Sequence, residues 1–276
     1  MQLTNDQLKT YHDLGYLLLP NCFTPGEVEM METEAAALCL QDLPGKVIKK
    51  DGKTVRIIHG AHMENKVFHG VVRHSKLIEP VMQIVGDSSV YIHRCSINFK
   101  PGFEDTMWSW HQDSYYFCKD DGMPRTDAAI AILFLDEVNE FNGPTLLMPG
   151  SHQEGLISPI AESEECSSLE EKQYLKLRRT QHILSRTTVT KLVEKYGIVA
   201  PKGAAGSVLL FHPSCVHGSA PNIMSPFNRT IVVIAYNSVK NIPIAVENPR
   251  PEYVAGRDYR ALEPLAENIL QHFASR

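Results

Sequence analysis

The sequence lacks the features that mark several special classes of protein. Its apolar runs fall short of the roughly 18 residues that a membrane-spanning helix needs. It has no block of lysines and arginines, and its formal net charge is -5, so neither nucleic acid nor a membrane is expected as the main partner. The first residues lack the charged and apolar regions of a signal peptide, which predicts a cytoplasmic location.

The six cysteines are scattered and form no Cys-x-x-Cys pair, so we expect them to be reduced. Hydrophobic residues make up 43% of the 276 residues, which is enough to bury a full core. We therefore predict a single domain spanning residues 1–276.

Short apolar segments separated by turn residues dominate the middle and later parts of the chain. The clearest expected strands are 88–100, 128–135, 207–211 and 229–237. Helix start signals lie at Thr4 and Thr24, before apolar residues at helical spacing. The pattern predicts a mainly β (α+β) fold, a jelly roll with flanking helices. The polar stretch 154–202 interrupts it and is either a lid over a site or a plain surface excursion.

The stretch Trp110-His111-Gln112-Asp113 carries the main chemical signal. On an extended strand, His111 and Asp113 would share one face and could bind one metal ion. A third ligand could come from the later stretch 206–219, which offers both His212 and His217. Two histidines and one carboxylate are the ligands typical of non-haem Fe(II) oxygenases. Taken alone, such a pair is more often two hydrogen-bonded polar residues in a strand.

Two further groups of polar residues surround this stretch. Arg94, Ser96, Asn98 and Lys100 alternate along the preceding strand and share one face. Because that strand precedes the possible metal pair, we expect this face to line a polar cavity and not to face solvent. The four histidines between residues 59 and 74 match no ligand motif, so we expect structural or surface roles for them.

Several ordered motifs together resemble the phytanoyl-CoA dioxygenase superfamily. They are Asn98-Phe99-Lys100-Pro101-Gly102-Phe103, Trp110-His111-Gln112-Asp113, Asp121-Gly122-Met123-Pro124, Asn142-Gly143-Pro144 with Pro149-Gly150-Ser151-His152, and His217-Gly218-Ser219 followed by Arg229. Within the superfamily the chain resembles the ectoine hydroxylases. It resembles bacterial hydroxylases of free leucine and related amino acids more closely, in motifs such as Phe211-His212-Pro213 and in the segment 250–258.

The resemblance implies a double-stranded β-helix that binds Fe(II) and uses 2-oxoglutarate and dioxygen as co-substrates. It implies His111, Asp113 and His217 as the iron ligands, which selects His217 over His212. Because related halogenases replace the carboxylate with a small residue, the presence of Asp113 predicts hydroxylation.

The same resemblance implies residues for the co-substrate. Arg229 would pair with the far carboxylate of 2-oxoglutarate, which a planar guanidinium can bind through two parallel hydrogen bonds. Lys100 would be a second cation for this carboxylate, and Asn98 and Ser219 are neutral candidates nearby. A jelly-roll module that binds a metal or sugar without turnover would not need such a pair of cations.

The predicted substrate is a small molecule, a free aliphatic L-amino acid such as leucine. Arg250 or Arg257 would bind its carboxylate, unless both only form surface salt bridges. Tyr115 and Phe117 would line an apolar pocket, unless both are ordinary core aromatics. The alternative substrate is ectoine or a larger natural-product intermediate. Against ectoine, residues 114–117 lack the Phe-Glu-Thr-Trp run associated with its binding.

Overall fold

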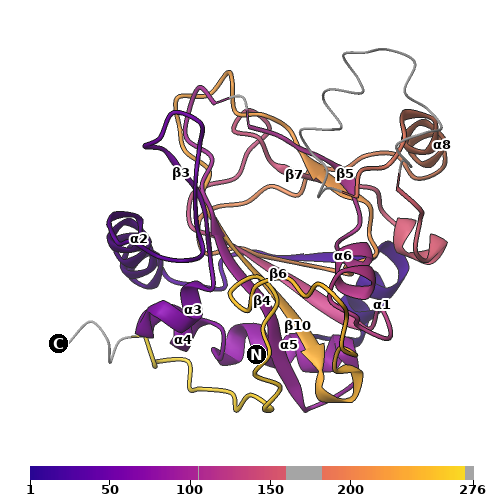
Figure 1. The fold of residues 1–276 in the computed structure, drawn as a ribbon, viewed down its shortest axis with the longest axis horizontal. Helices are drawn as coiled ribbons and strands as arrows, with labels where there is room; N and C mark the ends of the chain where they lie inside the picture. Colours follow the sequence, from indigo (N-terminus) through magenta and orange to yellow (C-terminus); the bar gives the residue numbers. More distant parts are fainter. Residues whose placement is uncertain (105, 160–181, 271–276) are drawn as a thin grey trace.

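Two antiparallel sheets form the centre of the molecule (Figure 1). The computed structural model describes residues 1–104, 106–159 and 182–270. The larger sheet has the strand order β1-β8-β6-β10-β4-β3-β2, and the smaller sheet has the order β5-β9-β7. The strands are β1 (Tyr16–Leu19), β2 (Lys46–Ile48), β3 (Val55–His59), β4 (Val90–Asn98), β5 (Trp108–His111), β6 (Ala128–Phe134), β7 (Thr145–Leu147), β8 (Val208–Phe211), β9 (His217–Ser219) and β10 (Ile231–Ser238).

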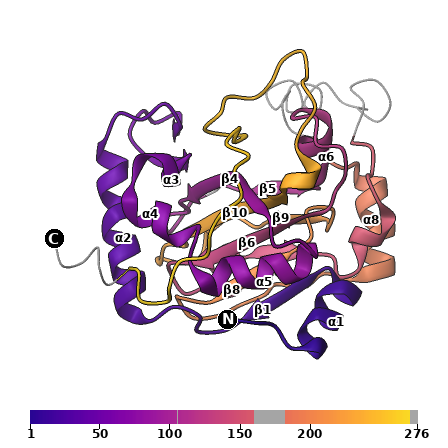
Figure 2. The same ribbon diagram turned by 90° about the horizontal axis from the view of Figure 1, so that it is seen from below.

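Helices flank these sheets (Figure 2). They are α1 (Asn5–Leu14), α2 (Pro25–Leu40), α3 (Ala61–Glu64), α4 (Lys66–Val71), α5 (Ser75–Val85), α6 (Asp113–Lys119) and α8 (Arg186–Tyr196), with 3-10 turns η1 (Ser151–Glu154) and η2 (Val239–Asn241). The predicted helix starts at Thr4 and Thr24 are confirmed, and each residue forms a capping box at the start of its helix, α1 or α2. None of the helices in the described ranges combines the length and hydropathy of a membrane span.

The larger sheet separates two hydrophobic clusters because its side chains alternate between two faces. In β6, Ala129, Ala131 and Leu133 pack in the cluster that includes the helices. Ile130, Ile132 and Phe134 point the other way, into a second cluster. In β10, Val233 pairs with Ile132 and belongs to the same second cluster. The face that carries this second cluster is the inner face of the sheet. It is turned toward the smaller sheet and forms the floor of the site.

Part of the predicted insertion falls outside the described residues, as does Cys166. Residues 160–181 are in that part, so a lid over residues 154–202 stays a prediction. Within the described part, the helix expected near its end is present as α8, with Ser185 as its N-cap. The cysteines of the described ranges are free thiols.

Candidate active site

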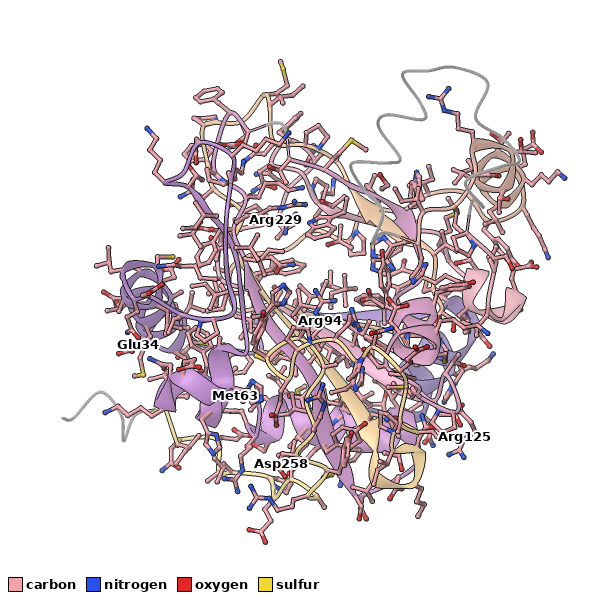
Figure 3. The ribbon with its side chains drawn as sticks, viewed as in Figure 1. Glu34, Met63, Arg94, Arg125, Arg229 and Asp258 are labelled. Carbon is pink, nitrogen blue, oxygen red and sulfur yellow. The ribbon has the colours of Figure 1, made fainter. Side chains whose placement is uncertain are left out.

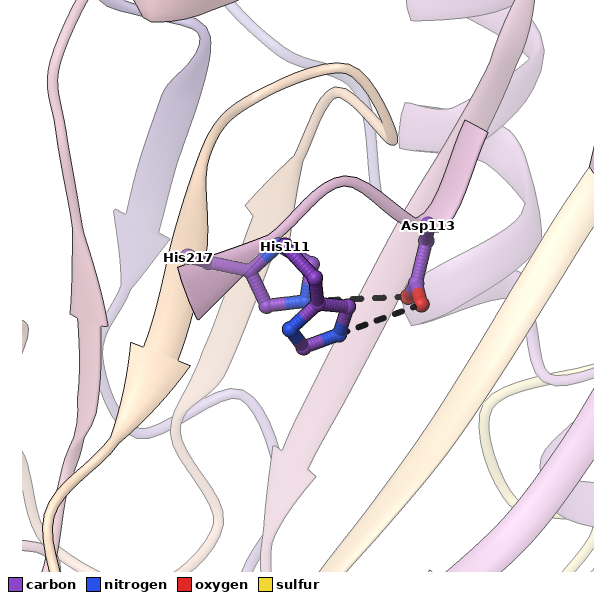
Figure 4. Close-up of side chains that lie close together, drawn as sticks. All are labelled: His111, Asp113 and His217. Atoms are coloured by element: carbon purple, nitrogen blue, oxygen red, sulfur yellow. Dashed lines mark ion pairs between the residues drawn. The ribbon is translucent and has the colours of Figure 1, made fainter. Parts of the chain in front are cut away.

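The sheet register brings two of the predicted metal ligands face to face. Strand β5 pairs with β9 so that His111 lies opposite His217, and their ring centroids are 4.2 Å apart. Asp113 completes the group: its Oδ1 lies 3.6 Å from His111 Nε2 and its Oδ2 lies 3.7 Å from His217 Nε2 (Figure 4). One donor atom from each of these residues lies within 4.8 Å of the others, so the three can bind one metal ion.

The prediction that His111 and Asp113 share one strand is wrong. Strand β5 ends at His111, and Asp113 is the first residue of helix α6. The chain turns at Gln112, whose side-chain amide donates to the carbonyl oxygens of Gly155 and Ser214 at 2.8 and 2.7 Å. Asp113 thus reaches the histidines from a helix N-terminus, where the helix dipole favours a carboxylate.

Hydrogen bonds set the tautomer of both imidazoles. His111 Nδ1 lies 2.7 Å from the Ser109 carbonyl oxygen, and His217 Nδ1 lies 3.0 Å from that of Cys215. Each Nδ1 therefore carries the proton and donates it, which leaves each Nε2 free to bind a metal. Burial, together with the nearby His111, lowers the pKa of His217 to about 4, so this ligand is neutral at neutral pH.

The carboxylate is kept ionised. Burial raises the pKa of Asp113, but its contacts with His111, His217 and Arg94 outweigh this effect and hold the pKa below its usual range. The alternative ligand His212 lies outside this group, and its Nδ1 accepts a hydrogen bond from the Ser214 amide. Two imidazoles and one carboxylate form the donor set that suits Fe(II) with open positions.

A cavity of about 760 Å³ opens beside these three residues. Its apolar floor is the inner face of the larger sheet and includes Ile132, Phe211, Ile231 and Val233. Arg229, Asn98 and Ser219 also line it, so three of the residues predicted for the co-substrate lie together.

Two cations lie side by side at this end of the cavity. Arg229 donates from Nε and Nη2 to the Gly143 carbonyl oxygen at 3.1 and 2.9 Å. Lys100 lies behind it, with Nζ 2.5 Å from Ser219 Oγ and 3.2 Å from the same Gly143 oxygen. Burial and the charge of Arg229 lower the pKa of Lys100 to about 6, and burial lowers the pKa of Arg229 to about 10.

Neither Lys100 nor Arg229 forms an ion pair with a carboxylate of the described residues. Their hydrogen-bond acceptors are neutral oxygens. These oxygens satisfy the N–H donors of both side chains, but they do not neutralise a positive charge on either one. A bound anion would stabilise both charged forms, because an opposite charge within a few ångströms favours ionisation.

The prediction that Tyr115 and Phe117 line the pocket is wrong by one residue. Neither residue lines the cavity, whereas Tyr116 does. Phe117 is buried against His93, with ring centroids 4.6 Å apart. Tyr115 packs on His182, also at 4.6 Å. Because α6 is a helix, alternate residues do not share a face, and the residue between the two nominated ones points to the cavity.

The two arginines predicted for substrate binding occupy different places. Arg250 lines the cavity and is paired with Asp121, with Nε 2.7 Å from Oδ1 and Nη2 2.5 Å from Oδ2. Arg257 does not line this cavity, and its Nη2 donates to the Arg250 carbonyl oxygen at 2.7 Å. Only Arg250 of this pair is placed to contact a ligand near the metal ligands.

The cavity is also lined by residues that were not predicted as site residues. His59, expected to be structural or at the surface, lines the cavity, and burial lowers its pKa to about 3. His182 reaches the cavity from the end of the insertion. Arg94, which the strand pattern did place on a cavity-lining face, has Nη1 3.9 Å from Asp113 Oδ1. Figure 3 shows Arg94 near the centre of the molecule, with Arg229 nearer the loops.

Comparison with known proteins identifies the family. The family model of phytanoyl-CoA dioxygenase (PhyH) matches residues 11–230. The chain belongs to this family. As a PhyH protein it is similar to the ectoine dioxygenase of Bordetella bronchiseptica, at 35% identity over 273 residues that cover 95% of this chain and 86% of the relative. It is also similar to the L-proline trans-4-hydroxylase of Streptomyces griseoviridis, at 28% identity over 91% of this chain and 92% of the relative.

The PhyH fold is also seen in a solved relative. The crystal structure of EctD from S. alaskensis with 2-oxoglutarate and 5-hydroxyectoine matches with a TM-score of 0.80 and 29% identity, covering 96% of this chain and 88% of that chain. The predictions of a dioxygenase of this family and of a jelly roll with flanking helices are confirmed. The particular closeness to hydroxylases of free leucine stays a prediction.

Proposed function

We propose that this PhyH protein is an Fe(II)- and 2-oxoglutarate-dependent dioxygenase that hydroxylates a small zwitterion of the ectoine or cyclic amino-acid type. One observation carries the proposal. The His111, Asp113 and His217 group and the buried Arg229 line one cavity, together with the partly buried Arg94.

The metal ligands fit iron by their chemistry. Two imidazole Nε2 atoms and a carboxylate are the facial set of non-haem Fe(II) oxygenases, and they leave positions open for a co-substrate and dioxygen. Bound iron with its co-substrates supplies the oxidising chemistry, while the protein positions the target carbon and excludes side reactions. In this chain, His111 and His217 are held by their Nδ1 hydrogen bonds in the tautomer that binding requires.

The co-substrate end fits a dicarboxylate. Arg229 and Lys100 bind the far carboxylate of 2-oxoglutarate, because both are buried donors whose present acceptors are neutral, and a bound carboxylate favours the charged form of each. Asn98 and Ser219 supply neutral contacts, and the Asn98 Oδ1 is buried without a hydrogen-bond partner in the described structure. The crystal structure of EctD from S. alaskensis contains 2-oxoglutarate, which supports the same use here.

The substrate end fits a carboxylate joined to a compact carbon skeleton. Arg94 has a buried Nε without a partner, and its guanidinium forms no hydrogen bond within the described ranges. A buried polar group without a partner is costly, so a ligand that supplies an acceptor gains affinity. Ile57, Val246 and Val254 give the cavity apolar surface for the carbon skeleton. Ectoine and proline, on which the relatives named above act, combine both features.

A free aliphatic amino acid such as leucine is the second candidate. It would offer Arg94 the same carboxylate, and the segment 114–117 on α6 lacks the run associated with ectoine binding. Selection between carbon skeletons rests on apolar contacts, where one methylene contributes only about 1 to 3 kcal/mol. The two candidates therefore differ in the shape of the cavity wall and share the chemistry of its charged end.

The test compares succinate release and hydroxylated product across ectoine, L-proline, L-leucine, N-acetyl-leucine and leucinamide. Asp113→Ala is the matched inactive control, and product is measured by mass so that uncoupled succinate is recognised. We expect ectoine or proline to give the most product. If leucine exceeds both, the second candidate replaces the first. If the blocked derivatives exceed every free zwitterion, the whole assignment is wrong.

A further inference from the structure

The segment 243–256 forms one wall of the cavity although it contains neither helix nor strand. It follows η2 and lies over the sheet as the gold coil in Figure 2. The cavity-lining residues that it contributes are Val246, Glu247, Asn248, Arg250 and Val254. Such a segment has no ladder of backbone hydrogen bonds to fix its position, so its contacts with the rest of the fold must do so.

Asp121 makes the strongest of these contacts. Its carboxylate accepts two parallel hydrogen bonds from Arg250, at 2.7 Å from Nε and 2.5 Å from Nη2. This is the fork geometry in which an arginine binds a carboxylate most specifically. The Arg250 guanidinium also lies 5.5 Å from the ring centroid of Tyr116, the cavity-lining residue of α6. Arg250 is thus held between a buried carboxylate and the cavity wall.

His93 orients Asp121 from behind. Its Nε2 lies 2.8 Å from Asp121 Oδ2, and both side chains are almost fully buried, at 1% and 2% exposure. Burial lowers the pKa of His93, so the ring is neutral and its proton sits on Nε2, which donates to the carboxylate. The charge of Asp121 is therefore matched by Arg250, while His93 supplies a directional hydrogen bond.

The backbone of segment 243–256 docks on the same two residues or their neighbours. The Ile244 amide donates to the Gly122 carbonyl oxygen at 2.8 Å, and the Gly256 amide donates to that of His93 at 2.7 Å. Gly122 has φ +83°, and a Cβ there would lie 2.1 Å from the Ile244 carbonyl oxygen. Both ends and the middle of the segment are therefore anchored at one place, the His93 and Asp121 pair.

We propose that Asp121, oriented by His93, is a positioning residue that determines substrate specificity by holding Arg250 and segment 243–256 against the cavity. The effect on catalysis rests on the proposed function, whereas the anchoring does not. Asp121 touches neither the metal ligands nor the co-substrate cations, so its loss should change substrate recognition and leave 2-oxoglutarate binding intact.

The first experiment uses Asp121→Asn, which keeps the size of the side chain and removes its charge. Asp127→Asn is the matched control, because Asp127 is exposed and its ion pair within the described ranges is with Arg125, across 2.7 Å. We expect the KM of the best substrate of the panel to rise about tenfold to 100-fold, as displacement of a binding group does. The KM for 2-oxoglutarate should stay within about twofold in both variants.

The second experiment separates positioning from a general structural role. Arg250→Gln and the double variant with Asp121→Asn complete a double-mutant cycle for the substrate KM. If Asp121 acts through Arg250, the double variant matches Arg250→Gln. Additive effects, or a lowered melting temperature with unchanged KM, would overturn the proposal.

Hydrogen exchange of the Ile244 and Gly256 amides tests the anchoring without any substrate. We expect faster exchange at both amides in Asp121→Asn and in Arg250→Gln, and unchanged exchange in Asp127→Asn. This measurement stays decisive if no member of the panel is hydroxylated, which would defeat only the proposed function. Should Asp121→Asn fail to fold, unchanged exchange in Arg250→Gln would still refute the anchoring.

Discussion

The metal end of the cavity and its outer wall are built from different kinds of structure. At the metal end, His111 and His217 are neighbours across a pair of hydrogen-bonded strands, and Asp113 is at the start of a helix. The outer wall is the irregular segment 243–256, held mainly through Asp121. The predicted metal ligands thus rest on regular elements, whereas the wall proposed to contact the substrate rests on a segment that can change without rebuilding a sheet.

The largest effect is expected at the metal end. Asp113→Ala removes the one anionic ligand, so Fe(II) binding should weaken and turnover should fall below detection. His212→Ala is the matched control, because this buried histidine lies outside the ligand group. It should lower the melting temperature and leave catalysis nearly unchanged. Anaerobic Fe(II) titration and product analysis check both. An active Asp113→Ala variant would contradict the ligand assignment.

The next effect concerns the co-substrate. Arg229→Ala leaves a bound carboxylate without its buried partner, which costs about 2 to 5 kcal/mol. The Kd for 2-oxoglutarate should rise accordingly, with little change in substrate affinity. Arg257→Ala is the control, because Arg257 lies outside the cavity. If titration shows unchanged 2-oxoglutarate binding in Arg229→Ala, this arginine has another function.

A smaller effect is expected at the boundary between the two regions. Arg94→Gln removes a charge-assisted contact with the substrate carboxylate, worth about 1.5 to 3 kcal/mol. The substrate KM should rise while Fe(II) affinity is kept. If Fe(II) affinity falls and the substrate KM stays unchanged, Arg94 instead supports Asp113, whose Oδ1 lies 3.9 Å from Arg94 Nη1. That result would show that Arg94 belongs to the metal site and not to the substrate-binding wall.

The smallest effect is a pH dependence of 2-oxoglutarate binding. Burial and the charges of Arg229, Arg56 and Lys49 lower the pKa of Lys100 to about 6, so its amine is largely neutral at pH 7 and above. A bound carboxylate favours the ammonium form, so binding takes up a proton and the affinity falls as pH rises above about 6. One linked proton changes the affinity by at most about 1.4 kcal/mol per pH unit.

Lys100→Met should remove this slope and keep whatever affinity Arg229 provides. Calorimetric titrations between pH 6.5 and 8.5 would measure it in two buffers, so that proton uptake is counted directly. An identical slope in the variant would show that another group takes up the proton.

Two errors of the sequence-based prediction concern the same part of the chain, where β5 gives way to α6. The interval from His111 to Asp113 was assigned to a strand, but Gln112 turns the chain through contacts with Gly155 and Ser214, which are distant in sequence. The nominated Tyr115 and Phe117 also lie on α6, where the residue between them, Tyr116, is the one that lines the cavity. The identities of the ligands were still predictable, because spacing and ordered motifs do not depend on that turn.

The outer wall was less predictable for a different reason. Segment 243–256 has no periodicity, so nothing local indicates which of its side chains face a cavity. Arg250 and Arg257 look equivalent in sequence, and only the carboxylate of Asp121 distinguishes them in space. The strand that carries Arg94 was predicted to line the cavity because alternation along a strand is readable from the sequence.

Alternate residues of β6 lie on opposite faces of the sheet, so substitutions at them have different effects. Ala129, Ala131 and Leu133 face the helices, so changes there act mainly on the stability of the fold. Ile132 is part of the cavity floor, so a change there reshapes the space beside the predicted metal ligands. In a family with such a sheet, substitutions at the cavity-facing positions can change the substrate. The helix-facing positions meanwhile keep the fold stable. Mutational tolerance along this strand should therefore alternate with a period of two residues.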